Sequence, residues 1–169
     1  GAFTVDPDIL ALSGPAWRVH DTPGAGPPQS NWVVADGIVS ETSNHYLGVA
    51  SETSPDTERP GTYREYLPSA GATDGELRFE ISSADDDGLG VALRFTDREH
   101  HYLWAMDSQR SFRIFARKNG DDYAVLARNS KGFVRERWYS VRIALRGAAI
   151  QVYVNGERSE EHTSELQSR

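Results

Sequence analysis

The chain has 169 residues, a formal net charge of −7 and 38% hydrophobic residues, which is enough apolar material for one domain with a single core. It has no cysteine, which excludes disulfides, thiolate zinc sites and a cysteine nucleophile. The acidic balance argues against nucleic-acid binding, and no apolar run approaches the roughly 20 residues that a membrane span needs. We therefore expect one soluble domain.

The N-terminal part predicts little regular structure. Residues 1–30 are rich in glycine, proline, aspartate and serine, and they predict an arm with one short edge strand. Residues 31–41 predict a hairpin, because Asp36 and Gly37 separate two runs of β-forming residues. A further strand is expected over residues 62–67.

Two predicted strands flank a cluster of aspartates. Residues 76–82 alternate apolar and charged side chains, and residues 89–95 place large apolar groups at every second position. Between them lie Asp85, Asp86 and Asp87. Carboxylates crowded into one loop repel one another unless a cation lies among them, and hard oxygen donors suit calcium. The alternative is a solvated acidic turn, since aspartate is favoured in turns.

The second half of the chain predicts more short strands. Asn119-Gly120 marks a hairpin turn between two of them. Short strands joined by turns rich in glycine and aspartate, without an amphipathic helix, predict an all-β antiparallel sandwich of two sheets. These later strands are expected over residues 101–106, 112–117, 123–127, 138–145 and 150–154.

The C-terminal end, residues 158–169, has no strand periodicity. It resembles the translation of a common sequencing adaptor, a stretch found at the ends of many metagenome-derived gene models. We therefore expect a non-native or disordered tail and a truncated domain. Residues 152–157 would then be the first half of a hairpin whose returning strand is missing. An acidic, flexible terminus is the alternative.

Three stretches together resemble a known superfamily. Residues 83–95 read Ser-Ala-Asp-Asp-Asp-Gly-Leu-Gly-Val-Ala-Leu-Arg-Phe, residues 102–107 read Tyr-Leu-Trp-Ala-Met-Asp, and residues 138–142 read Trp-Tyr-Ser-Val-Arg. In these stretches the chain resembles concanavalin A-like jelly-roll domains. It is similar to the laminin G and thrombospondin C-terminal modules and to bacterial secreted domains of that superfamily. The resemblance implies a jelly roll over residues 31–157, after the arm of residues 1–30.

The resemblance also implies a metal. In the thrombospondin-like group, aspartates ahead of a glycine-containing strand help to bind calcium, which implies this role for Asp85, Asp86 and Asp87. Asp97 is a further candidate ligand, with Asp107 and Asp21 as alternatives, because the sequence does not show which loops converge. The expected loss of the last strands would leave such a site incomplete.

Polar side chains alternate with the predicted core residues and define a second candidate site. Such a face can hydrogen-bond sugar hydroxyls or acidic sugars. The alternative is an ordinary wet sheet face with salt bridges. Trp138 shares this outer phase and is a candidate platform for stacking sugars, whereas Tyr102 and Trp104 fall on the core phase. The predicted ligand-binding residues are Arg78, Glu80, Arg94, Arg113, Arg142 and Tyr153.

Together these features predict a non-catalytic, calcium-stabilised binding or adhesion module that recognises a glycan or a protein surface. We expect it to be one domain of a larger secreted bacterial protein, extracellular or at the cell surface, and monomeric in isolation. The alternative is a glycoside hydrolase of the same superfamily acting on a polysaccharide. Such an enzyme needs two facing carboxylates, and Glu80 has no obvious partner in the sequence. A metal-free interaction domain is the third hypothesis.

Overall fold

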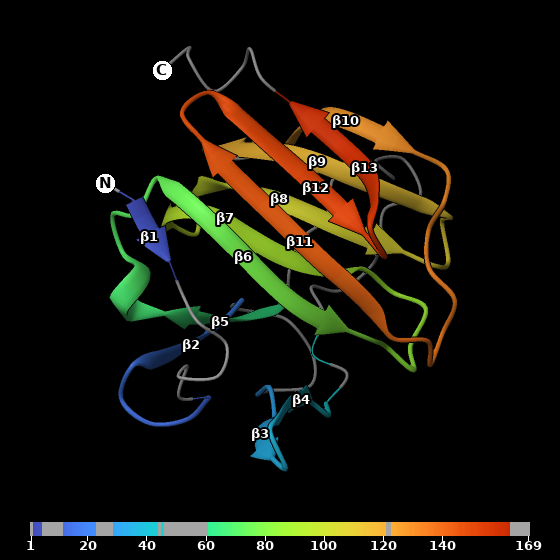
Figure 1. Ribbon diagram of the computed structural model, residues 1–169. Helices are drawn as coiled ribbons and strands as arrows, with labels where there is room; N and C mark the ends of the chain where they lie inside the picture. Colours follow the sequence, from blue (N-terminus) through green and yellow to red (C-terminus); the bar gives the residue numbers. More distant parts are fainter. Residues whose placement is uncertain are drawn as a thin grey trace. The chain divides into compact units, whose positions relative to one another are not determined.

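The computed structural model (Figure 1) describes residues 2–4, 12–22, 29–43, 45, 61–120 and 123–162. Within them the chain is all-β apart from one 3-10 turn, so the predicted fold class is confirmed. No helix in these ranges is long and apolar enough to cross a bilayer. The elements are β1 (Ala2–Thr4), β2 (Trp17–Asp21), β3 (Trp32–Ala35), β4 (Ile38–Glu41), β5 (Thr62–Tyr66), η1 (Leu67–Ser69), β6 (Asp74–Ile81), β7 (Leu89–Asp97), β8 (His100–Asp107), β9 (Phe112–Asn119), β10 (Tyr123–Asn129), β11 (Tyr139–Arg146), β12 (Ala149–Val154) and β13 (Glu157–His162).

The chain divides into two compact units, one of residues 9–70 and the other of residues 1–8 and 71–169. The division into an arm of residues 1–30 and a jelly roll of residues 31–157 stays a prediction. In the smaller unit, β2 pairs with β5 and β3 pairs with β4, all antiparallel. The β3–β4 hairpin is confirmed. Asp36 and Gly37 have φ values of 51° and 74°, as expected for the tight Asp-Gly turn of such a hairpin.

The larger unit is a sandwich of two sheets. One sheet has the order β1-β6-β11-β12-β13, and the other has the order β10-β9-β8-β7. Figure 1 shows β6, β11, β12 and β13 in front of β7 to β10. Every pair is antiparallel except β1 with β6, which is parallel.

The main core fills the space between the two sheets. Trp104 and Phe115 from the four-stranded sheet join Ile143 and Val152 from the five-stranded sheet in one buried cluster. Along β11 the even-numbered positions face away from this cluster, while Tyr139, Val141 and Ile143 are buried. The alternation predicted for β11 and β12 is therefore confirmed. The even-numbered residues of β11 and the odd-numbered residues of β12 lie on the same outer, polar side of the sheet.

The two central strands of the four-stranded sheet, β8 and β9, are buried on both faces over most of their length. Leu103 and Ala105 of β8 lie in a second buried cluster with Phe112 and Ile114 of β9. Phe115, which follows Ile114 in β9, is also buried but belongs to the main core. Strand β9 thus has no polar face, which explains why its sequence alternates less cleanly than that of β11.

The C-terminal hairpin has its returning strand. Backbone of β13 pairs with β12 from Glu157 to His162, with a register shift between Val152 and Tyr153. The expectation that this strand is missing is therefore wrong, because backbone pairing needs no particular side-chain pattern. Residues 163–169 lie outside the described residues.

Candidate functional site

The outer side of β6, β11 and β12 carries a row of three side chains. Arg142 in the middle strand is the register partner of Arg78 in β6 and of Tyr153 in β12. Residues directly opposite on antiparallel strands point to the same side of a sheet, so the pairing brings these three predicted residues together. Main-chain pairing on both sides of β11 fixes the spacing of the row.

Two further rows flank this one. On one side Ser140 is opposite Glu80, and its hydroxyl donates a hydrogen bond of 3.4 Å to Oε1 of that carboxylate. On the other side Ala144 lies between Glu76 and Gln151. We call the whole set the polar face. It consists of Glu76, Arg78, Glu80, Ser140, Arg142, Gln151 and Tyr153.

Glu76 bridges the two arginines of the middle row. Its Oε1 accepts a short hydrogen bond from Nε of Arg78, and its Oε2 lies 3.5 Å from Nη1 of Arg142. The hydrogen bond from Arg78 holds the pKa of Glu76 below its usual value, and the positive charges of Arg78 and Arg142 add to this effect. One carboxylate therefore offsets the repulsion between two guanidinium groups.

Tyr153 holds Arg142 from the other side. The guanidinium carbon of Arg142 lies 3.9 Å from the centre of the Tyr153 ring, a cation–π contact. The Tyr153 hydroxyl donates to Oε1 of Gln151 at 3.3 Å. One face of the ring is thus covered by Arg142, so Tyr153 orients the guanidinium rather than offering that face to a ligand.

Arg94 does not lie on the polar face. Its φ of 49° is left-handed and coincides with an irregularity in the β7–β8 register, so the side chain leaves the alternation predicted for the strand. Its Nε donates to the Thr73 carbonyl at 2.9 Å and its Nη2 to the Gly147 carbonyl at 2.7 Å. The predicted outward position of Arg94 is therefore wrong.

The sequence pattern also predicts the wrong position for Arg113. It is buried, its Nε donates to the Gly132 carbonyl at 2.9 Å, and its guanidinium carbon lies 5.7 Å from the centre of the Tyr139 ring. It therefore points between the two sheets, beside Phe115. The predicted non-core position is wrong because both faces of β9 are covered.

The aspartate loop, which contains Asp85, Asp86 and Asp87, is hydrogen-bonded to the turn between β8 and β9. The Asp86 carbonyl accepts hydrogen bonds from the amides of Ser108 and Gln109 at 3.1 and 2.9 Å. Within the loop, Oδ1 of Asp85 accepts from the Asp86 amide at 2.8 Å. One carboxylate oxygen is thus already engaged by the backbone, as in an ordinary aspartate turn.

The carboxylates of this loop influence one another. Burial raises the pKa of Asp87, and the charges of Asp85 and Asp86 raise it further. The fully buried carboxylate of Asp107 adds to this rise, although it is itself held by the amide and guanidinium of Arg110, both at 2.6 Å.

Asp97 lies away from the aspartate loop. The loop precedes β7 and Asp97 ends that strand, so the two are roughly 25 Å apart at about 3.3 Å per residue. Asp97 instead pairs with His100 at 2.8 Å. No group of three His, Asp or Glu in the described ranges could hold a metal ion. The side chains described do not form a closed calcium site, and calcium binding at Asp85, Asp86 and Asp87 stays a prediction.

Sequence reasoning missed part of the polar face. Glu76, Ser140 and Gln151 were not predicted, although each lies two residues from a predicted member of the face and shares its phase. The period of two could have found them. It could not show that Glu76 contacts two arginines, because that contact depends on the register between β6 and β11.

One solved structure resembles this chain in fold. It is the carbohydrate-binding module CBM66 from Bacillus subtilis, with a TM-score of 0.65 and 12% sequence identity over 88% of this chain and 80% of that one. At this identity the likeness shows the fold alone, an all-β sandwich. No protein-family model matches the chain, and no protein of curated function matches it. The narrower resemblance to laminin G and thrombospondin modules stays a prediction.

Proposed function

We propose that this chain is a non-catalytic carbohydrate-binding module and that its polar face binds the glycan. The observation that carries the proposal is the middle row, in which Arg142 is held between Glu76 and Tyr153 beside the exposed Arg78. The shared sandwich fold with a solved carbohydrate-binding module supports it. Fold alone does not fix function, so the argument depends on the chemistry of the face.

The polar face alternates donors with acceptors. The Arg78 side chain is 68% exposed and its Nε is engaged by Glu76, so most of the side chain is accessible to a ligand. Along the same strand, the exposed Glu80 offers carboxylate oxygens, and Ser140 on the neighbouring strand β11 offers a hydroxyl. A sugar presents neighbouring hydroxyl groups that both donate and accept, which suits such a pattern.

The arrangement of Arg142 lowers the cost of binding. Its guanidinium is already ordered by the Tyr153 ring and the Glu76 carboxylate, so less side-chain freedom is lost when a ligand binds. An ordinary salt-bridged surface would contain ion pairs without such stacking.

The polar face does not resemble a glycosidase centre. Glu76 and Glu80 are four residues apart on one strand, about 13 Å between Cα atoms, and they lie side by side rather than across a cleft. A general acid needs a raised pKa, whereas that of Glu76 is lowered. These features favour binding over hydrolysis.

The wider setting is also part of the proposal. We infer an extracellular or cell-surface bacterial protein of which this chain is one domain, acting as a monomer. Calcium held near the aspartate loop would stabilise the fold rather than contact the glycan, and the crowding of charge around Asp87 supports this role.

The test is binding of the full chain to immobilised xylan, mannan, β-glucan, fructan and pectin, followed by titration of the best ligand. Arg142→Ala should weaken binding roughly ten- to a hundredfold, because a hydrogen bond to a charged group contributes about 1.5–3 kcal/mol. Arg146→Ala is the matched control, since Arg146 is exposed on the same strand and side. It should bind like the wild type.

Two results would contradict the proposal. One is an absence of binding to every polysaccharide by a folded chain. The other is binding that Arg142→Ala leaves unchanged while both variants melt like the wild type. Release of reducing sugar that Glu80→Gln abolishes would instead support the hydrolase hypothesis.

A further inference from the structure

Trp138 is unusual among the four tryptophans of the chain. It is 53% exposed, whereas Trp104 is fully buried. The indole of Trp32 donates to the Thr62 hydroxyl at 2.9 Å, and Trp17 packs against Tyr66 with ring centres 5.0 Å apart. Only Trp138 therefore presents most of a large aromatic surface to solvent, and an exposed indole is well suited to contact an amphipathic partner.

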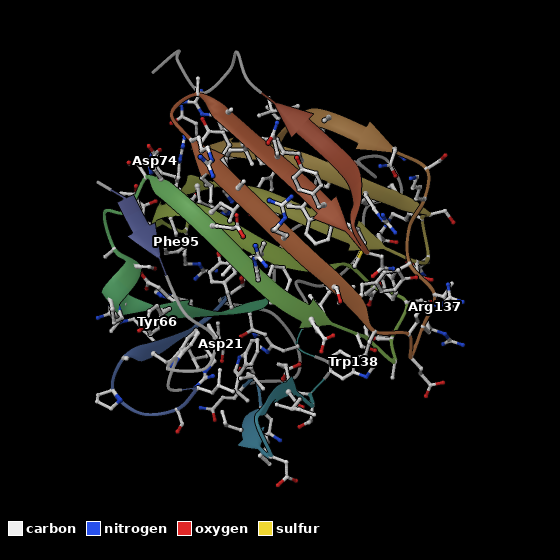
Figure 2. The ribbon with its side chains drawn as sticks, viewed as in Figure 1. Asp21, Tyr66, Asp74, Phe95, Arg137 and Trp138 are labelled. Atoms are coloured by element: carbon white, nitrogen blue, oxygen red, sulfur yellow. The ribbon has the colours of Figure 1, made fainter. Side chains whose placement is uncertain are left out.

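Trp138 lies at the end of the polar face. It directly precedes β11, whose first residue Tyr139 is buried and paired with Ile81. Alternation along an extended chain puts Trp138 on the side of Ser140 and Arg142, opposite Tyr139. Figure 2 shows Trp138 where β6 ends and β11 begins. It is four positions from Arg142 along the chain, or about 13 Å.

The loop that carries Trp138 is ordered by its own contacts. The Val134 amide donates to the Tyr139 hydroxyl at 2.9 Å, and the Glu136 amide donates to the Ser83 carbonyl at 2.7 Å. Phe133 is buried in the main core and anchors the start of the loop. The indole is thus presented from a fixed backbone, so ligand contact would cost little ordering of the chain.

We propose that Trp138 is a second contact of the glycan site and that the site therefore binds an extended oligosaccharide rather than a single sugar. This inference rests on the proposed function of the polar face. A single monosaccharide does not span the distance from the Arg142 row to Trp138. One sugar unit would hydrogen-bond to the row, and a later unit would place its C–H face on the indole.

The experiment compares ligands of increasing length. Xylo-, cello- and fructo-oligosaccharide ladders of one to five units are titrated into the full chain by calorimetry. For the wild type, affinity should rise with length until the ligand reaches Trp138. Trp138→Ala should lose that rise, with about five- to tenfold weaker binding of the longest ligands and unchanged binding of the shortest.

Two further variants separate stacking from a general effect on the loop. Trp138→Phe keeps an aromatic ring and should restore most of the dependence on length. Val134→Ala removes exposed apolar surface from the same loop, since Val134 is 52% exposed, and should bind like the wild type.

The outcomes distinguish the two proposals. If oligosaccharides bind and Arg142→Ala weakens them, but Trp138→Ala responds to length as the wild type does, the role of Trp138 is overturned and the polar face stands. Equal weakening of short and long ligands by Trp138→Ala also overturns it. If no ladder binds to the folded wild-type chain, the proposed function falls and this inference falls with it.

Discussion

His101 is a buried histidine with both ring nitrogens in hydrogen bonds. Its Nδ1 lies 3.1 Å from the Asp97 carbonyl, and its Nε2 lies 2.6 Å from the Tyr123 hydroxyl. A carbonyl can only accept, so Nδ1 carries the proton and Nε2 accepts from Tyr123 in the neutral ring. Burial lowers the pKa of His101, and Lys118 adds to this, while Asp97 and Glu99 oppose it.

The lowered pKa makes stability depend on pH. Because the folded state holds His101 neutral, its contribution is fully present above the ordinary histidine pKa of about 6.5 and is lost as the pH falls towards the lower, folded value. We expect the free energy of unfolding to decrease over this range in urea melts. His101→Gln, which cannot take up a proton, should flatten that decrease.

The neighbouring histidine supplies the control for this measurement. His100 is exposed and pairs with Asp97, so His100→Gln should keep the steep loss of stability in acid. A His101→Gln protein that loses stability in acid as steeply as the wild type would show that other groups cause the pH dependence.

At the scale of single residues, prediction succeeded where the strand alternates without interruption. Arg78, Glu80, Arg142 and Tyr153 lie on the outer side of their strands, as the period of two predicts. The prediction for Arg94 failed because Arg94 itself has a left-handed backbone conformation, which interrupts the alternation. An arginine in the sequence gives no sign of that conformation.

At the scale of strands, β7 and β8 approach each other closely at one glycine. A Cβ on Gly90 would collide with the Trp104 carbonyl oxygen and lie 2.7 Å from Cα of Ala105. Both neighbours are backbone atoms of β8, which cannot turn aside as a flexible side chain can. This explains why a glycine is the second residue of strand β7.

Gly90→Ala should therefore destabilise the fold by about 2–3 kcal/mol or more, because β8 would have to move to relieve the collision. Gly120→Ala is the comparison. Gly120 has a φ of 98° and nothing within 4 Å of the added carbon, so its cost is conformational, about 1–2 kcal/mol. Denaturant unfolding measures both. If Gly90→Ala proves no more costly than Gly120→Ala, the strands are not in close contact there.

Strand patterns predicted individual elements better than their partners. The hairpin of residues 31–41 was predicted from its own sequence, and its strands β3 and β4 pair with each other within the unit of residues 9–70. Local periodicity identifies a strand and its buried side, whereas the sheet that it joins depends on contacts distant in sequence. The same limit hid the pairing of β13, whose residues lack a strand-like pattern.

At the scale of the whole molecule, calcium binding can be tested by stability. A thermal melt of the full chain in excess calcium is compared with one in chelator. Occupancy at about 100 times the dissociation constant should stabilise the fold by roughly 2.7 kcal/mol, or several degrees in melting temperature. Asp86→Ala should remove the shift if the aspartate loop holds the ion, whereas Asp97→Ala, far along β7, should keep it. Coincident melts for the wild type would leave the loop an acidic turn.

The two sheets of the sandwich are connected at both ends, by hydrogen bonds from Arg94 at one end and by the loop between β6 and β7 at the other. At one end, Arg94 of β7 reaches the carbonyls of Thr73, just before β6, and Gly147, between β11 and β12. At the other end, the Ser108 amide in the β8–β9 turn donates to the Asp86 carbonyl in the loop after β6. Figure 2 shows Asp74 and Trp138, which mark these two ends of β6, far apart on the sheet.

The connection made by Arg94 has a mechanical consequence. If the sheets slid past each other, the two hydrogen bonds of Arg94 would be sheared together, so these two bonds would share the load. We expect the larger unit to unfold in a single step when it is stretched from its ends. Arg94→Ala should lower the rupture force in single-molecule stretching, whereas the exposed Arg146→Ala should not. Under the proposed function, the polar face would keep its shape while a bound glycan is under tension.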